Sequence, residues 1–115
     1  MIAGLNPNET FEMVSITEKD TANPTKFILG MITGEDRVVL MSHFEPEPKD
    51  INPAYYYALV RKGLKGIKNF KAYDGVKDIT EITDGVLDQI PIAVIKEMFQ
   101  VLLKMNFLAE DEIKN

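Results

Sequence analysis

The sequence contains no cysteine, no tryptophan and only one histidine. Without cysteine, disulfide bonds, thiolate metal sites and cysteine nucleophiles are excluded. With His43 as the single histidine, a conventional zinc site lacks its further ligands, and Ser15 and Ser42 lack the glycines of a nucleophile elbow. The seven glycines show neither the dinucleotide-binding nor the Walker spacing. We therefore expect no cofactor, no metal and no enzymatic activity.

The chain also lacks a surplus of basic residues and any long apolar run. Its formal net charge of -5 disfavours general affinity for nucleic acid, which depends on positive potential. No run reaches the roughly 18 apolar residues of a membrane span, and the N-terminus shows no basic region followed by an apolar one. With 115 residues, 45% of them hydrophobic and 27% charged, the chain is predicted to be one soluble, cytoplasmic domain.

What the sequence does contain is a long helical pattern from Pro91 to Leu108. At about 100° per residue its polar or small positions share an arc of roughly 100°, while its apolar positions spread over about 200°. That apolar arc is wider than packing on one side requires. Two interpretations stay open: a central helix enclosed by its own domain, or a helix that also offers part of its surface to another chain.

The first third of the chain predicts two strands. Residues 11–16 alternate apolar and polar side chains, and residues 26–32 are almost continuously apolar, with Gly30 marking a bulge or a close backbone approach. Residues 34–44 are ambiguous between helix and strand, because Thr33 and Asp36 imitate a capping box whereas Val38 and Val39 favour a strand. We favour a helix.

The remainder predicts a connector, further helices and an edge strand. Residues 45–52 carry two prolines and are expected to form an exposed connector, while residues 1–10 and 109–115 are expected to be a flexible lead and a terminal helix or tail. A helix is predicted over 53–62, ended by Gly63 at a left-handed C′ position, with an edge strand or loop over 64–70. Asn106 is predicted to close the long helix in the same left-handed conformation. Together these predict a single α+β domain: a small antiparallel sheet of N-terminal strands packed by three to four helices, with the long C-terminal helix central.

One stretch combines basic and aromatic residues and is called here the basic-aromatic stretch. It contains Arg61, Lys62, Lys65, Lys68 and Lys71, flanked by Tyr55, Tyr56, Tyr57, Phe70 and Tyr73. Such a stretch can contact nucleic acid or an acidic partner. Equally, the cations can be solvated and the aromatic rings can belong to the core.

Three phrases in this order resemble small proteins of tailed phages that are described as tail assembly chaperones or as morphogenesis proteins. They are F-I-L-G-M-I-T-G-E-D-R at 27–37, A-L-V-R-K-G-L-K-G-I-K-N-F at 58–70 followed by Asp74-Gly75, and the ending from Leu87 to Asn115. Ile67 stands where that pattern has a tryptophan.

The resemblance implies a binding function in the host cytoplasm, and residence in the virion is a second option. The implied partners are phage structural proteins such as the tape measure or tail tube protein, and a homo-oligomer is also open. The alternatives are a minor virion structural protein or a small regulatory, nucleic-acid-binding protein that uses residues 55–73. The candidate partner-binding residues are Tyr56, Arg61, Lys62, Lys65, Lys68, Phe99 and Leu103.

Overall fold

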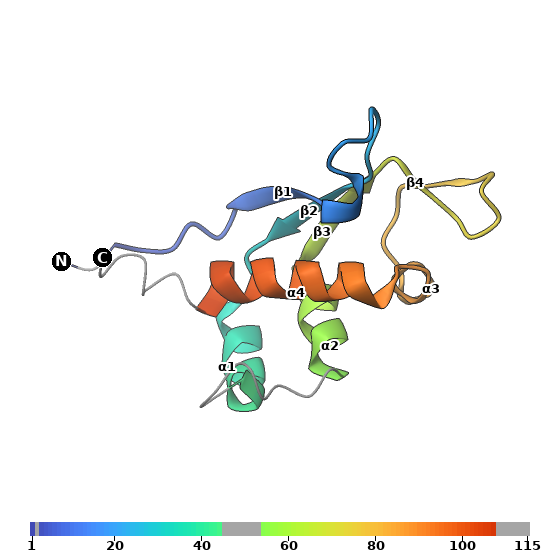
Figure 1. Ribbon diagram of the computed structural model, residues 1–115. Coiled ribbons are helices and arrows are strands. Elements are labelled where there is room, and N and C mark those ends of the chain that lie inside the picture. Colours follow the sequence, from blue (N-terminus) through green and yellow to red (C-terminus); the bar gives the residue numbers. More distant parts are fainter. Residues whose placement is uncertain (2, 45–53, 108–115) are drawn as a thin grey trace.

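Short strands and one long helix organise the fold (Figure 1). The computed structural model describes residues 1, 3–44 and 54–107. The elements are β1 (Thr10–Val14), η1 (Ile16–Glu18), β2 (Lys26–Gly30), α1 (Gly34–Phe44), α2 (Ala54–Gly63), β3 (Leu64–Lys68), β4 (Phe70–Lys71), β5 (Asp78–Ile79), α3 (Asp84–Asp88) and α4 (Ile92–Phe107). The α+β class is confirmed, and so is the helix over 34–44. The predicted connector at 45–52 and tail at 109–115 lie outside the described residues.

The main sheet has three antiparallel strands in the order β1-β2-β3, with α1 and α2 inserted between β2 and β3. Phe11 lies opposite Leu29 in the first pair, and Phe27 lies opposite Ile67 in the second. Both predicted N-terminal strands are therefore present, and the run after Gly63 forms an edge strand. A second, two-stranded sheet pairs β4 with β5.

The backbone at Gly30 closely approaches a neighbouring residue, as predicted. The bulge, however, lies on β3, the strand that faces Gly30. The register between β2 and β3 shifts between Ile28 and Leu29, because Ile28 faces Gly66 whereas Leu29 faces Leu64. Lys65 is therefore the extra residue of a β-bulge. A Cβ atom on Gly30 would come within 2.9 Å of the Lys65 Cγ atom, so a side chain at position 30 would collide with the bulge.

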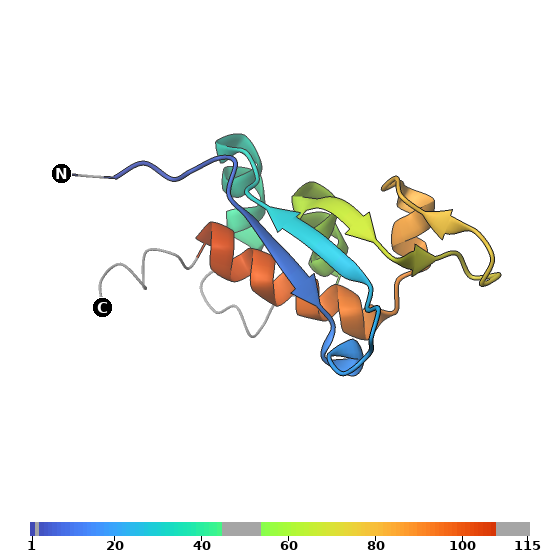
Figure 2. The same ribbon diagram turned by 90° about the horizontal axis from the view of Figure 1, so that it is seen from above.

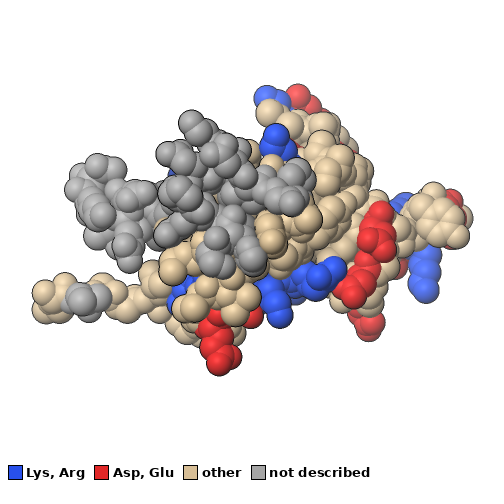
Figure 3. All heavy atoms as spheres, turned by 90° about the horizontal axis from the view of Figure 1, so that it is seen from below, with Lys and Arg blue, Asp and Glu red and all other residues tan. Residues whose placement is uncertain are grey.

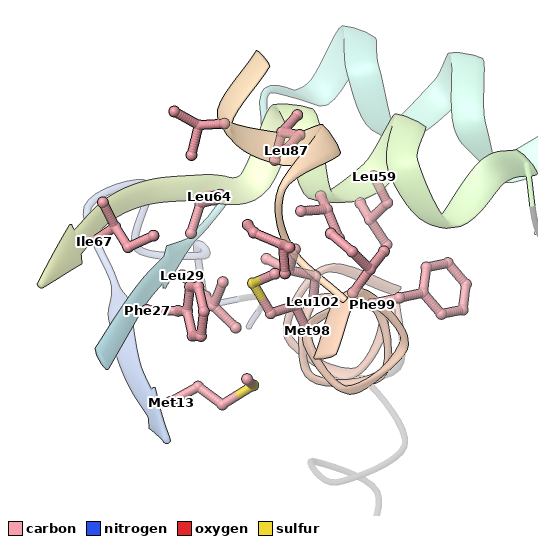
Figure 4. Close-up of a cluster of buried hydrophobic side chains, with 14 of the residues drawn as sticks. Met13, Phe27, Leu29, Leu59, Leu64, Ile67, Leu87, Met98, Phe99 and Leu102 are labelled. Atoms are coloured by element: carbon pink, nitrogen blue, oxygen red, sulfur yellow. The ribbon is translucent and has the colours of Figure 1, made fainter. Parts of the chain in front are cut away.

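Helix α4 is the middle layer of the molecule. The sheet covers one of its sides, and α1 and α2 lie on the other (Figure 1). Met13, Phe27 and Leu29 point from the strands towards Met98 of α4, and Leu59 and Leu102 lie between α2 and α4 (Figure 4). Five α4 or α2 side chains in this core are 0% exposed: Leu59, Val60, Ile95, Met98 and Leu102. This burial explains why the apolar arc of α4 is wider than one face.

Gly63 ends the helix as predicted, but not because it adopts a left-handed conformation. Gly63 is the last residue of α2, and among the described residues Gly75 is the glycine with a positive φ. What requires glycine at position 63 is a close approach of α2 to α4: a Cβ atom there would lie 2.4 Å from Cδ2 of Leu102. The chain then continues directly into β3.

The prediction for Asn106 is also wrong. Asn106 lies inside α4, 6% exposed, and its side-chain Nδ2 donates to the Leu102 carbonyl at 3.0 Å. Its Oδ1 accepts from the backbone N–H of Ile32 at 2.9 Å. Asn106 thus ties the long helix to the segment that leads from β2 into α1. Among the described residues, the asparagine in the left-handed conformation is instead Asn69, with φ 57°, between β3 and β4.

Local capping chemistry agrees with the sequence. The Thr33 Oγ1 atom accepts from the Asp36 backbone N–H at 3.1 Å at the start of α1, and Thr83 caps α3 through Val86 N–H. A turn at Asp74-Gly75 joins β4 to β5, with Gly75 at φ 73°. Backbone N–H groups of Val76 and Lys77 donate to the Asp74 carboxylate and lower its pKa below the ordinary 3.8.

Candidate functional site

Four of the five cations of the basic-aromatic stretch are paired with carboxylates from other parts of the chain. Arg61 lies 3.0 Å from Asp84, Lys62 3.8 Å from Asp36, Lys68 3.9 Å from Glu12, and Lys71 2.8 Å from Asp78. The Lys65 Nζ atom donates to the Lys62 carbonyl at 3.1 Å. On the face shown in Figure 3, basic and acidic side chains form small separate groups with uncharged surface between them. The stretch is therefore not a continuous field of positive charge.

The aromatic residues of the same stretch belong mainly to the core. Tyr55, Tyr56, Tyr57 and Phe70 are partly buried and pack against the core cluster. The Tyr56 ring lies 4.5 Å, centroid to centroid, from the ring of Phe99. Tyr73 is the exception, with 90% of its surface exposed.

The structure thus separates the candidate partner-binding residues into two groups. Phe99 and Leu103 are 4% and 7% exposed and belong to the core, with Tyr56 half-buried against Phe99. Arg61, Lys62 and Lys65 are exposed where α2 passes into β3, and Lys68 is exposed near the other end of β3. Lys68 and Lys71 also line a polar hollow of about 520 Å³ beside Asn69 and Asp78. Their role in binding stays a prediction.

A larger groove of about 590 Å³ runs between β1 and α4. β1 is an edge strand, and no strand pairs with its outer side in the described part of the chain. Figure 2 shows β1 at the border of the sheet, running in the direction opposite to α4. The groove is lined by Phe11, Glu12, Met13, Val14, Ile16, Lys19, Glu97, Gln100, Val101 and Lys104.

One end of this groove is held by a carboxylate. The Glu97 Oε2 atom accepts from the Ser15 hydroxyl at 2.7 Å, and its Oε1 atom accepts from the backbone N–H of Ile16 at 2.9 Å. Ser15 is 3% exposed and also caps η1. Hydrogen bonds to a carboxylate are among the stronger ones, so Glu97 fixes the turn after β1 beside α4.

The sequence did not reveal this groove. On the helical pattern Glu97, Gln100 and Lys104 belong to the polar arc, which predicts solvent and nothing more. Val101 belongs to the broad apolar arc. The sequence does contain one signal for the groove: Gln100, Val101 and Lys104 follow Glu97 by three, four and seven residues, which puts all four on one face of the helix. Only the structure shows that β1 borders that face.

Helix α1 carries a second apolar surface. Val38, Val39 and Met41 are 67%, 63% and 43% exposed, whereas Leu40 is buried at 7%. In Figure 1 the helix extends away from α4 on the side opposite the sheet. Large apolar side chains grouped on one exposed helix are typical of surfaces that bind other proteins.

The described residues show no arrangement for metal binding: no three His, Asp or Glu side chains among them lie close enough to hold an ion. None of the helices in the described part of the chain has the length and apolar character that crossing a membrane requires. What the geometry offers is two surfaces suited to protein contacts, the β1–α4 groove and the exposed face of α1.

The chain is therefore an α+β protein with candidate protein-binding surfaces. Comparison with protein-family models, with curated proteins and with solved structures gave no match for this chain.

Proposed function

We propose that the chain is a non-enzymatic phage morphogenesis protein: a tail assembly chaperone that binds an apolar segment of the tape measure or tail tube protein in the host cytoplasm. The ordered phrases at 27–37, 58–70 and 87–115 support this class by resemblance. A minor structural protein of the virion is the nearest alternative, because it would bind the same partners and then remain in the particle.

The observation that carries the proposal is the exposed apolar face of α1. A chaperone of this kind must present apolar side chains that a client segment can cover, and Val38, Val39 and Met41 do so on one helix. Of the four successive residues 38–41, Leu40 alone is buried in the core. The other three apolar side chains are therefore not part of the core of the domain itself. Covering a side chain of valine size contributes about 1.5 kcal/mol or more to binding.

A regulatory role on nucleic acid has less support. Four of the five cations of the basic-aromatic stretch lie within ion-pair distance of carboxylates, and most of the aromatic rings are packed inward. Such a role would require unpaired cations on a continuous face and aromatic rings free to stack on bases. A mobility-shift titration at low salt tests this alternative, and a shift that weakens steeply with salt would favour it.

The chaperone proposal is tested by co-expression with the tape measure and tail tube proteins of the same genome. We expect one of them to co-purify with the wild-type chain and to be lost from the Val38→Glu variant. Val76→Glu is the matched control, because Val76 is 80% exposed in the turn between β4 and β5. It should retain the partner.

The proposal is wrong if neither structural protein co-purifies with the wild type. Retention by Val38→Glu would move the client site away from α1. Mass spectrometry of purified particles separates the two remaining roles, since a chaperone is absent from the particle and a minor virion protein is present in it.

A further inference from the structure

The β1–α4 groove has a charge pattern that is complementary to itself. Along α4 the groove face reads Glu97, Gln100, Val101 and Lys104, at spacings of three, four and seven residues. At about 1.5 Å per residue, Glu97 and Lys104 lie roughly 10 Å apart along the helix axis, on either side of the Gln100–Val101 pair. If a second α4 packed antiparallel with its centre at the same pair, each Glu97 would face Lys104 of the second copy.

The strand side of the groove repeats this symmetry. The hydrogen bond from Ile16 N–H to Glu97 sets the register between the two elements, and β1 runs opposite to α4 (Figure 2). Phe11 therefore lies towards the Lys104 end of the groove. Phe11 is 49% exposed and Ile16 is 69% exposed, so each end of the groove carries one exposed apolar side chain. The rotation that brings Glu97 to Lys104 also brings Ile16 to Phe11 of the second copy.

One further cation lies at the Ile16 end of the groove. Lys19 lines the groove there, beyond Ile16. Glu12 also lines the groove, but its carboxylate lies 3.6 Å from Lys26 and 3.9 Å from Lys68, so it does not belong to this charge pattern.

We propose that the occupant of the β1–α4 groove is a second copy of this chain, bound about a two-fold axis near Gln100 and Val101. The unpaired edge of β1 would join β1 of the second copy, so that the sheet continues from one subunit into the other. A client segment would need no such internal symmetry in the groove. The dimer goes beyond the proposed function, because the client surface on α1 is a different one, and its test does not involve the client.

The experiment is a measurement of molar mass by light scattering after size-exclusion chromatography, up to the highest concentration at which the chain stays soluble. The wild type should have the mass of two chains. Lys104→Glu places two acids at each contact, and Gln100→Arg places cations at the axis, so both should have the mass of one chain. Lys96→Glu, an equal charge change on an exposed residue of α4 outside the groove, should remain a dimer.

Charge exchange between two variants makes the test specific. Glu97→Lys alone should be monomeric, but an equimolar mixture with Lys104→Glu should give the mass of two chains, because each contact then joins opposite charges. Circular dichroism of every variant checks that the helices are formed, and Gln100→Arg carries the test if Glu97→Lys does not fold without its bonds to Ser15 and Ile16. A monomeric wild type would overturn the proposal, and so would dimeric mass in both Lys104→Glu and Gln100→Arg or monomeric mass in Lys96→Glu.

Discussion

The inner face and the groove face of α4 differ in how deeply their side chains are buried. On the inner face Ile95, Met98 and Leu102 are 0% exposed and belong to the hydrophobic core. On the groove face Gln100 and Lys104 are exposed and Val101 is half-buried. Both faces belong to one helix of 16 residues, so their difference comes from what covers each of them.

The breadth of the apolar arc of α4 therefore has two causes. The inner face is apolar because it is enclosed on two sides, by strands and by α2. The apolar contribution to the groove face comes from Val101, which borders an open groove. The inner face therefore determines the stability of the fold, and the groove face is available to determine association.

The largest expected effect separates the two faces directly. Leu102→Asp should lower the free energy of unfolding by more than about 4 kcal/mol, because it removes a buried leucine and places an unpaired carboxylate in the core. Single domains are stable by about 5–15 kcal/mol, so a loss of this size should leave the variant partly unfolded or close to unfolding.

The matched control is Gln100→Asp on the groove face, two residues away. It should cost less than about 1 kcal/mol, because an exposed position loses only helix propensity. Urea unfolding at low protein concentration, where association does not contribute, measures both variants. Equal losses in the two would mean that the inner and groove faces are not distinct in the way described.

The second effect concerns the end of α4, where Asn106 reaches the segment between β2 and α1. Asn106→Leu should cost about 2 kcal/mol, because the buried N–H of Ile32 loses its acceptor at 2.9 Å while the volume of the side chain is nearly kept. Gln100→Leu removes an amide from the groove face without orphaning a buried group, and it should leave the midpoint in urea nearly unchanged. A comparable loss in both variants would show that the bond to Ile32 is not what stabilises this end of the helix.

Much of the fold could be predicted from the sequence because local patterns determine local elements. The alternation at 11–16 marks a strand with one buried face, and the Thr33–Asp36 capping pattern correctly outweighed the strand preference of Val38 and Val39. The long helix was evident from its period. Each of these signals lies within a few residues of the element that it predicts.

The errors arose where the reason for a residue lies far away in the sequence. Gly63 is glycine because Leu102 approaches it, and Asn106 is asparagine because Ile32 needs an acceptor, yet both were interpreted as local helix ends. The groove was missed for the same reason, since Glu97 binds Ser15 across 82 residues. Periodicity places a residue on a face of its helix, but it does not say what that face meets.

The smallest expected effect tests the close approach of α2 to α4, and its sign is more informative than its size. Gly63→Ala should destabilise the protein by about 1 kcal/mol, because its Cβ atom would lie 2.4 Å from the Leu102 Cδ2 atom and the leucine must shift within a filled core. Gly85→Ala in α3 should instead stabilise it by up to about 1 kcal/mol, because its nearest neighbour, the Thr83 Oγ1 atom, is 3.8 Å away and alanine favours the helix. Adding Leu102→Ala should remove the penalty at position 63, since the atoms that collide are then gone. A penalty that persists in the double variant would place its cause in the backbone at the junction of α2 and β3 rather than in the contact with α4.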